Sequence, residues 1–324
     1  MLYPLKFYPI YKNYVWGGKK LAALKNNKAD ENQQVSESWE LSAVSGNISI
    51  VANGFLSGNN LQELIEVYMG DLVGESVYEK YGMEFPLLLK FIDAAQPLSV
   101  QVHPDDEIAL KRHNAYGKDE MWYIIEAAND AEICLGFNQN INGEILQKSL
   151  RDKTLLDILN FEKIKEGNVF EVPSGRIHAI GKNVLLAEVQ NTSDITYRIY
   201  DWGREYDAKT ARQMHVDLAL DVIDYNSYST YKTEYEIIKN KGVDICRNGH
   251  FSVRAVDFDS TIIRNYVAVD SFTAYMCVDG EAILECNGKK ESMVKCETVL
   301  IPAEIDEVKL IPNRHARLLE ISMY

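Results

Sequence analysis

The pattern of apolar and polar positions predicts short strands along most of the chain. Leu87–Ala94 is an apolar run broken mainly by Lys90, while Leu98–His103 and Glu120–Ile125 alternate between apolar and polar residues. Such alternation is typical of a strand with one buried face. Three later ranges in this part of the chain are also predicted to be strands: Asn168–Val172, Val184–Gln190 and Ile195–Tyr200.

Helical signals are fewer. Asn60 and Glu63 have the spacing of a capping box at the start of a helix over Leu61–Tyr68. Leucines recur at helical spacing within 142–160, and a further helix is predicted over 211–223. Two shorter helices are expected near Gly18–Lys25 and Glu107–His113.

A polar stretch rich in Tyr and Ser, Asp224–Thr233, predicts a linker between two domains of residues 1–230 and 235–324. At least six short strands follow it. Asp279-Gly280 and Asn287-Gly288 are strong hairpin-turn signals. The strands expected there are Phe251–Val256, Ser271–Val278, Ala282–Cys286, Thr298–Pro302 and Arg317–Ser322.

Composition places the chain among globular proteins, because 46% of its 324 residues are hydrophobic and 25% are charged. Its formal net charge is −14. An acidic field of this kind repels nucleic acid and anionic membrane surfaces, so we expect neither as a partner. It also repels phosphorylated substrates, so any anion site must carry its own Arg or Lys.

Cysteine usage and the N-terminal segment favour the cytoplasm. The five cysteines form no Cys-x-x-Cys pair, and their odd number argues against a disulfide framework. The first residues lack the pattern of a signal peptide, and no apolar stretch approaches the roughly 20 residues that span a bilayer.

Two segments place metal-binding residue types on predicted strands. Gln101 and His103 lie two residues apart, so they share one strand face. Glu120 shares a face with Trp122 on another strand. An unpaired carboxylate among apolar neighbours is costly, and a bound cation would remove that cost.

A third segment fits a known motif. Gly167 is followed by five residues, then by Pro173, one residue, Gly175, two residues and His178. This spacing matches the second cupin motif, G-x5-P-x-G-x2-H. The first cupin motif is matched more loosely, with Gln101-Val102-His103 in place of His-x-His, followed by Glu120 and Gly136.

We therefore expect a mainly β fold with two cupin-like (jelly-roll) β-barrels and a small helical insertion. His103, Glu120 and His178 provide two imidazoles and one carboxylate, a set that suits a divalent metal with open positions for water or substrate. Zinc fits this set, and iron or manganese fits it as well. Gln101 is a further candidate ligand, while the other four histidines are predicted to be structural.

Beyond these motifs, the chain resembles the short bacterial form of type I mannose-6-phosphate isomerase, also called phosphomannose isomerase. The resemblance covers most of the chain. It rests on five runs: Tyr14-Val15-Trp16-Gly17-Gly18, Glu37-Ser38-Trp39-Glu40, the run from Gln96 to Asp105, the run from Gly117 to Tyr123, and the run from Gln190 to Arg204.

The resemblance implies an enzyme with one zinc ion per chain that interconverts mannose 6-phosphate and fructose 6-phosphate. It places zinc on His103, Glu120 and His178, with Gln101 as a further ligand. The partner implied is a small sugar phosphate, and the chain is expected to be a monomer or a homodimer.

The family's catalytic arginine corresponds to Arg198, its active-site lysine to Lys118 and an acid of its pocket to Glu188. Ser99, Lys118 and Arg198 are the expected substrate contacts. Because guanidinium stays protonated, Arg198 is expected to stabilise an enediolate or bind phosphate rather than act as a base. Lys118 is expected to bind phosphate or relay a proton, and Glu188 to be the general base.

Two other readings stay open at this point. One is a different metal-dependent cupin that acts on a sugar phosphate. The other is a non-catalytic bicupin that binds one. Residues 235–324 contain neither cupin metal motif, so that domain is predicted to lack metal ligands.

Overall fold

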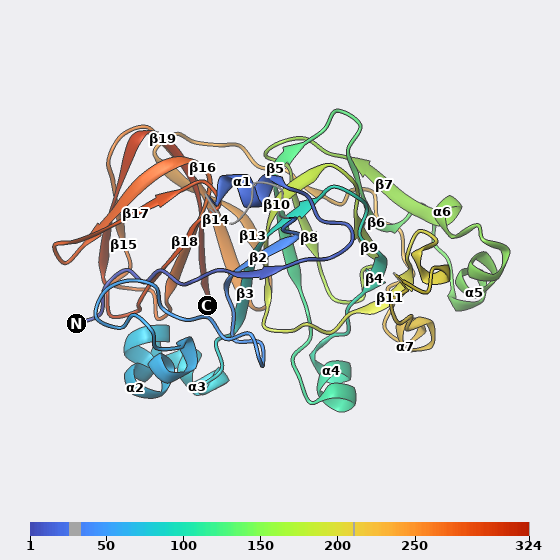
Figure 1. Cartoon of the computed structure of the whole chain (residues 1–324), viewed down its shortest axis with the longest axis horizontal. Helices are drawn as coiled ribbons and strands as arrows, with labels where there is room; N and C mark the ends of the chain where they lie inside the picture. Colours follow the sequence, from blue (N-terminus) through green and yellow to red (C-terminus); the bar gives the residue numbers. More distant parts are fainter. Residues whose placement is uncertain (26–33, 210, 324) are drawn as a thin grey trace.

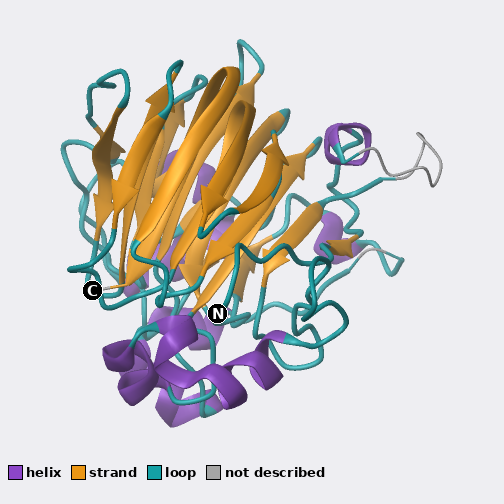
Figure 2. Cartoon of the chain, turned by 90° about the vertical axis from the view of Figure 1, so that its left-hand side faces the viewer, coloured by secondary structure: helices purple, strands orange, loops and turns teal. Residues whose placement is uncertain are grey.

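The computed structural model describes residues 1–25, 34–209 and 211–323. Within these ranges the chain is mainly β, as predicted, and its strands form three sheets with antiparallel ladders (Figure 1). Several helices gather at one end of the strands, seen at the bottom of Figure 2.

Residues up to 233 form two of the sheets. The first has the order β1-β2-β3-β10-β5-β8-β12. Its strands are β1 Ile10–Lys12, β2 Glu37–Leu41, β3 Leu87–Ala94, β10 Val184–Asn191, β5 Glu120–Ala127, β8 Val169–Val172 and β12 Lys232–Thr233. The second has the order β11-β4-β9-β6-β7, with β11 Tyr197–Tyr200, β4 Val100–Val102, β9 His178–Ile180, β6 Glu132–Phe137 and β7 Leu159–Lys163.

The third sheet comes entirely from residues 241–323. Its main path is β13 Lys241–Arg247, β14 Phe251–Phe258, β19 Glu307–Met323, β16 Thr273–Cys286 and β17 Lys289–Val294. Two shorter strands complete it, β15 Ile262–Asn265 beside β19 and β18 Thr298–Ile301 beside β16.

The two ends of the chain share one hydrophobic core. Leu5 pairs with Leu300 of β18, and Phe272 donates a backbone hydrogen bond to the carbonyl of Val73 at 3.1 Å. One buried cluster includes side chains from the first sheet, from helices within residues 20–81 and from the third sheet. The division into domains of residues 1–230 and 235–324 therefore stays a prediction.

The helices are short. They are α1 Lys20–Leu24, α2 Leu61–Val73, α3 Glu75–Tyr81, α4 Asp106–His113, α5 Gly143–Asp152, α6 Leu155–Ile158 and α7 Val216–Leu220, with a 3-10 turn at Arg204–Tyr206. The predicted capping box is present, because the Asn60 side chain accepts from the Glu63 amide and the Glu63 side chain from the Asn60 amide.

Both longer helices were predicted to cover more residues than they do in the structure. The range 142–160 contains α5 and α6, but Lys153 adopts a left-handed conformation that ends α5, and β7 begins at Leu159. In the range 211–223 only α7 is helical. Residues before α7 are held by contacts with β11 and the residue after it instead, since Arg212 bonds to Asp201 and the His215 ring accepts from the Arg198 backbone amide.

One predicted turn was wrong and the other is confirmed. Asp279-Gly280 lies inside the continuous strand β16, where the pairing with β19 shifts register. Gly280 has φ +71°, and a Cβ there would come within 2.1 Å of the His315 carbonyl, so glycine is needed for this bulge. Asn287-Gly288 does connect β16 to β17, and both residues have positive φ.

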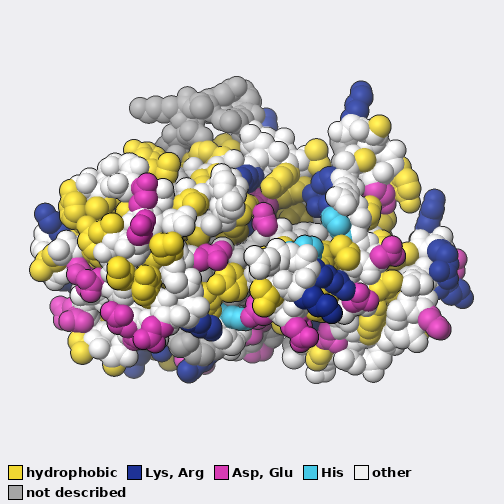
Figure 3. All heavy atoms as spheres, turned by 90° about the horizontal axis from the view of Figure 1, so that it is seen from below, with side chains coloured by type: hydrophobic (Ala, Val, Ile, Leu, Met, Phe, Trp, Pro, Cys, Tyr) yellow, Lys and Arg dark blue, Asp and Glu magenta, His cyan; other side chains and the backbone are white. Residues whose placement is uncertain are grey.

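Acidic side chains are scattered over the face drawn in Figure 3, as expected for a chain of net charge −14. All five cysteines are free and buried, in agreement with the expected lack of disulfides. In the part of the chain that the structure describes, no helix is long and apolar enough to cross a membrane.

Candidate metal centre and substrate pocket

Two rows of side chains, one from each of the first two sheets, line a pocket of about 320 Å³. In the first sheet Glu188 of β10 lies opposite Lys90 of β3 on one side and Trp122 of β5 on the other. Residues directly opposite in antiparallel strands point to the same face. This sheet therefore presents Lys90, Glu188 and Trp122 together, with Glu120 two residues before Trp122 on the same face.

The second sheet supplies the other row. Gln101 of β4 lies opposite Arg198 of β11 and opposite His178 of β9. Ser99 and Gln101 alternate along this segment with the buried Val100, as the valine spacing predicted. His103 follows directly after β4.

The three predicted metal ligands converge where the two rows meet. His103, Glu120 and His178 are buried, and their candidate ligand atoms all lie within 4.8 Å of one another. His103 Nε2 is 3.4 Å from Glu120 Oε1, and His178 Nε2 is 3.6 Å from Glu120 Oε2. We call these residues the metal triad.

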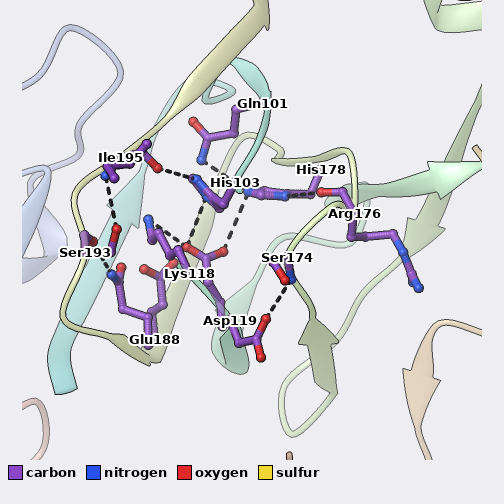
Figure 4. A network of polar contacts seen from close by, with 12 residues as sticks. Gln101, His103, Lys118, Asp119, Ser174, Arg176, His178, Glu188, Ser193 and Ile195 are labelled. Carbon is purple, nitrogen blue, oxygen red and sulfur yellow. Dashed lines mark hydrogen bonds and ion pairs between the residues drawn. The ribbon is translucent and has the colours of Figure 1, made fainter. Parts of the chain in front are cut away.

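The surroundings of the metal triad fix the ring orientations (Figure 4). His103 Nδ1 lies 2.7 Å from the carbonyl of Ile195, and His178 Nδ1 lies 2.8 Å from the carbonyl of Arg176. A carbonyl only accepts, so each Nδ1 carries the hydrogen and each Nε2 offers a lone pair to the centre. His103 Nε2 and Glu120 Oε2 are buried without a hydrogen-bond partner, which is the state expected of ligands for a cation.

The protonation states also suit a metal. Burial lowers the pKa of His103 to about 3, and the charge of Lys118 adds to this shift. Burial likewise lowers the pKa of His178. Burial alone would raise the pKa of Glu120, but Lys118 and His103 hold it well below its usual range. Neutral imidazoles and an ionised carboxylate are the forms that bind metal ions.

The glycine of the second cupin motif, Gly175, also shapes the turn before His178. Gly175 has φ +83°, and a Cβ there would lie 2.8 Å from the Val222 carbonyl, so this turn requires glycine. The Gly175 amide donates to the His103 carbonyl at 2.9 Å. The turn before His178 is thus tied directly to the residue that provides the other imidazole.

Lys118 and Gln101 border the metal triad. Lys118 Nζ is 2.8 Å from Glu120 Oε1. The Gln101 amide nitrogen lies 3.2 Å from His178 Nε2, and the Ser99 hydroxyl lies 3.4 Å from Gln101 Oε1. Gln101 thus contacts a triad atom, and its role as a further metal ligand stays a prediction.

Arg198 continues this row away from the metal triad. Its Nε donates to Ser99 Oγ at 3.1 Å and its Nη1 to the Gln213 carbonyl at 2.8 Å. No carboxylate within the described ranges forms an ion pair with Arg198. The guanidinium charge is therefore free to act on a bound anion.

Both carboxylate oxygens of Glu188 contact a neighbouring side chain. Oε1 is 2.7 Å from Lys90 Nζ, and Oε2 accepts from Trp122 Nε1 at 2.8 Å. Burial raises the pKa of Glu188, and the neighbouring Glu120 charge adds to the shift. Of the predicted site residues, all but His103 line the pocket, and His103 lies behind this lining with its Nε2 3.4 Å from Glu120 Oε1.

Comparison with known proteins agrees with this geometry. Residues 4–139 match the family model "Phosphomannose isomerase type I, catalytic domain". The mannose-6-phosphate isomerase ManA of Bacillus subtilis is 39% identical over 228 residues, which is 69% of each chain. The mannose-6-phosphate isomerase of Streptococcus mutans is 38% identical over 210 residues, or 64% of each chain.

This chain belongs to the type I phosphomannose isomerase family. A crystal structure of the mannose 6-phosphate isomerase from Bacillus subtilis also superposes with a TM-score of 0.86 at 28% identity, covering 99% of both chains. The family resemblance inferred from the sequence, and with it the prediction of an enzyme of this family, is confirmed.

The sequence did not single out several residues of the phosphomannose isomerase pocket. In the sequence, Lys90 is a charged residue within the largely apolar strand Leu87–Ala94. A charge in such a strand indicates a buried group that has a partner or a function. His215 was predicted to be structural, yet it lines the pocket. Other lining residues to which the sequence analysis gave no individual role include Tyr14, Trp16, Glu37, Asp194, Thr196 and Arg212.

Asp119 links the start of the strand that contains Glu120 to the turn that precedes His178. Its Oδ1 accepts from the Ser174 amide at 2.7 Å, as Figure 4 shows, and its own amide donates to Asn191 Oδ1 at 3.1 Å. Groups that orient metal ligands through such bonds are typically worth 10–100-fold in metal affinity or activity.

We therefore expect Asp119→Ala to weaken binding of a divalent metal by about 10–100-fold, because two ligand-bearing segments lose their link. Competition with a chromophoric chelator measures this affinity. Asp119→Asn keeps the acceptor oxygen and is expected to bind the metal nearly as well as the unaltered chain. Equal affinity of all three proteins would contradict a bracing role.

Proposed function

We propose that this chain interconverts mannose 6-phosphate and fructose 6-phosphate with one zinc ion per chain held by His103, Glu120 and His178. The observation that carries the proposal is the metal triad itself, in which His103 Nε2 and Glu120 Oε2 are buried without a hydrogen-bond partner. Glu120 and His178 line a pocket that also contains the guanidinium of Arg198. The family match supports the substrate.

The reaction transfers a proton between C2 and C1 of the open-chain sugar through an enediol, while a hydroxyl proton moves from O2 to O1. Glu188 is proposed to carry the carbon-bound proton. Its raised pKa supports this role, since a base titrating closer to neutrality both removes and returns a proton effectively. Lys90 and Trp122 hold the carboxylate in place for both steps.

A zinc ion held by the metal triad would supply positive charge that polarises the oxygens of the reacting carbons. Lys118 lies at the same end of the pocket, against Glu120, so we propose that it relays the hydroxyl proton rather than binding phosphate. Arg198, which also lines the pocket, adds positive charge, and Ser99, which accepts from Arg198, is proposed to contact the substrate.

Further parts of the proposal concern the whole molecule. We propose that the first two sheets form a catalytic cupin-like barrel and that the third forms a second barrel without metal ligands. A cytoplasmic location and a monomeric or homodimeric state also remain predictions.

A substrate panel tests the proposed function. Purified protein should convert mannose 6-phosphate to fructose 6-phosphate in a coupled assay, lose this activity after chelation and regain it with zinc. A different cupin isomerase would prefer another sugar phosphate in the panel. A non-catalytic bicupin would bind mannose 6-phosphate without converting it under any metal condition.

A further inference from the structure

The last residues before β5 are held by contacts to the start of α4. The Gly117 amide donates to Asp106 Oδ1 at 2.8 Å, and the Lys118 amide donates to the Pro104 carbonyl at 3.1 Å. The Lys118 side chain reaches in the other direction, to Glu120 Oε1. This segment therefore sets the positions of both Lys118 and Glu120 at the metal triad.

A histidine from the C-terminal part of the chain reaches the same segment. His250 lies in the turn between β13 and β14, and its Nε2 is 3.5 Å from Asp119 Oδ2 and 3.9 Å from Asp106 Oδ2. The other oxygen of each carboxylate accepts a backbone bond, Asp119 Oδ1 from Ser174 and Asp106 Oδ1 from Gly117. One imidazole thus lies between the two carboxylates that hold the start of β5.

The His250 ring projects from a turn that is itself fixed. Asn248 Oδ1 accepts from the amides of both His250 and Phe251 at 2.9 Å, and the Asn248 amide donates to the Phe251 carbonyl at 3.2 Å. The side chains of His250 and Asp119 are only 22% and 19% exposed, so salt screens their contact less than that of a surface pair. A cavity of about 290 Å³ borders both residues, so truncating His250 disturbs little close packing.

Two other basic side chains from the C-terminal part of the chain also contact β5. Arg317 Nη1 donates to the Tyr123 hydroxyl at 3.2 Å, and Lys295 Nζ lies 2.9 Å from Glu126 Oε1. Both contacts lie further along the strand than Glu120. Of the three contacts, the one made by His250 is the one beside the metal triad.

We infer that His250 is a positioning residue for the metal triad and acts through Asp119. Asp119 joins the start of β5 to the turn before His178, so a contact that fixes Asp119 acts on two ligand-bearing segments. The C-terminal part of the chain then contributes to the site without contacting metal or substrate. The inference rests on the metal centre of the proposed function and is independent of the sugar that reacts.

The test compares His250→Ala and His250→Gln with the unaltered chain and with Lys295→Ala. Lys295→Ala is a matched control, because it removes another basic contact to the same strand at a distance from Glu120. Zinc affinity is measured by competition with a chromophoric chelator. Values of kcat and KM for mannose 6-phosphate are measured at saturating zinc.

His250→Ala is expected to weaken zinc binding by about 3–10-fold, less than Asp119→Ala, because the bonds of Asp119 to Ser174 and Asn191 remain. It should also lower kcat with little change in KM, since the displaced groups act at the reacting end of the pocket. His250→Gln presents an N–H at a similar reach and should keep most of the affinity. Lys295→Ala should bind zinc as the unaltered chain does.

A double variant shows whether His250 acts through Asp119. In the Asp119→Ala background, His250→Ala is expected to cause no further loss of zinc affinity, because the group that it orients is already gone. A merely structural role would instead add its own loss to that of Asp119→Ala. His250→Leu keeps bulk but lacks the N–H, and it takes the place of the alanine variant if that variant does not fold.

Unchanged zinc affinity in His250→Ala would overturn the inference, as would a further loss in the double variant or an equal loss in Lys295→Ala. An unaltered chain that binds zinc but does not convert mannose 6-phosphate contradicts the proposed function alone. The chelator competition still decides the role of His250 in that case, because it needs no turnover. An unaltered chain that binds no zinc would overturn both.

Discussion

Replacing His178 by alanine is expected to lower isomerase activity by about 10³-fold or more. The metal triad would lose one of three ligands, and zinc would no longer be held at working concentrations. A catalytic metal supplies several kcal/mol of charge stabilisation, and each 1.36 kcal/mol corresponds to a factor of ten in rate. The coupled assay with mannose 6-phosphate gives the rate, and metal analysis gives the zinc content.

Loss of zinc and loss of activity should occur together in this variant. His315→Ala is a matched control, because His315 lies on the third sheet and pairs with Asp257 outside the pocket. This control should keep both zinc and activity. His178→Ala protein that is folded by circular dichroism and still turns over at the original rate would contradict the assignment of the triad.

The second large effect is expected for Arg198→Ala, with a loss of about 10²–10³-fold in kcat/KM. Removing one preorganised donor aimed at developing charge typically costs this much. Within the described residues no carboxylate forms an ion pair with Arg198, so its charge is available to the substrate. Arg198→Lys should recover part of the activity, since it restores charge but not the two-sided contact with Ser99 and Gln213.

Arg198 lies opposite Gln101, which contacts His178 of the metal triad, so the loss of Arg198 should lower kcat as well as raise KM. Arg314→Ala, at an exposed position of β19, should change neither parameter. An Arg198→Ala enzyme with unaltered kcat would remove Arg198 from the reacting end of the pocket.

The metal triad could be predicted from the sequence because its signals are local. His178 ends a motif whose turn needs Gly175, and Gln101 and His103 follow strand alternation. Convergence of Glu120 with the histidines was also predictable, since a buried acid requires a cation.

The other pocket residues depend on pairing between distant strands, which one sequence does not encode locally. Lys90 becomes functional only because β3 pairs with β10 in the register that places it opposite Glu188. Arg212 was assigned to a helix, and its contact with Asp201 overrides that propensity. Gly280 resembled a hairpin turn because a bulge and a turn both need positive φ.

The extent of each sheet was equally hard to foresee. The continuous strand β16 was predicted as two strands, because Asp279-Gly280 within it was interpreted as a hairpin turn, whereas the pairing with β19 only shifts register there. The packing of residues before Tyr81 against the third sheet likewise follows from tertiary contacts such as that between Val73 and Phe272.

The central claim is that zinc at the metal triad makes this chain a mannose-6-phosphate isomerase. Titration of zinc into metal-free protein, followed by the rate of mannose 6-phosphate conversion, tests it most directly. We predict that the rate rises in proportion to added zinc and stops rising at one zinc ion per chain. Full activity in the metal-free protein, or no activity at any zinc content, would contradict the account.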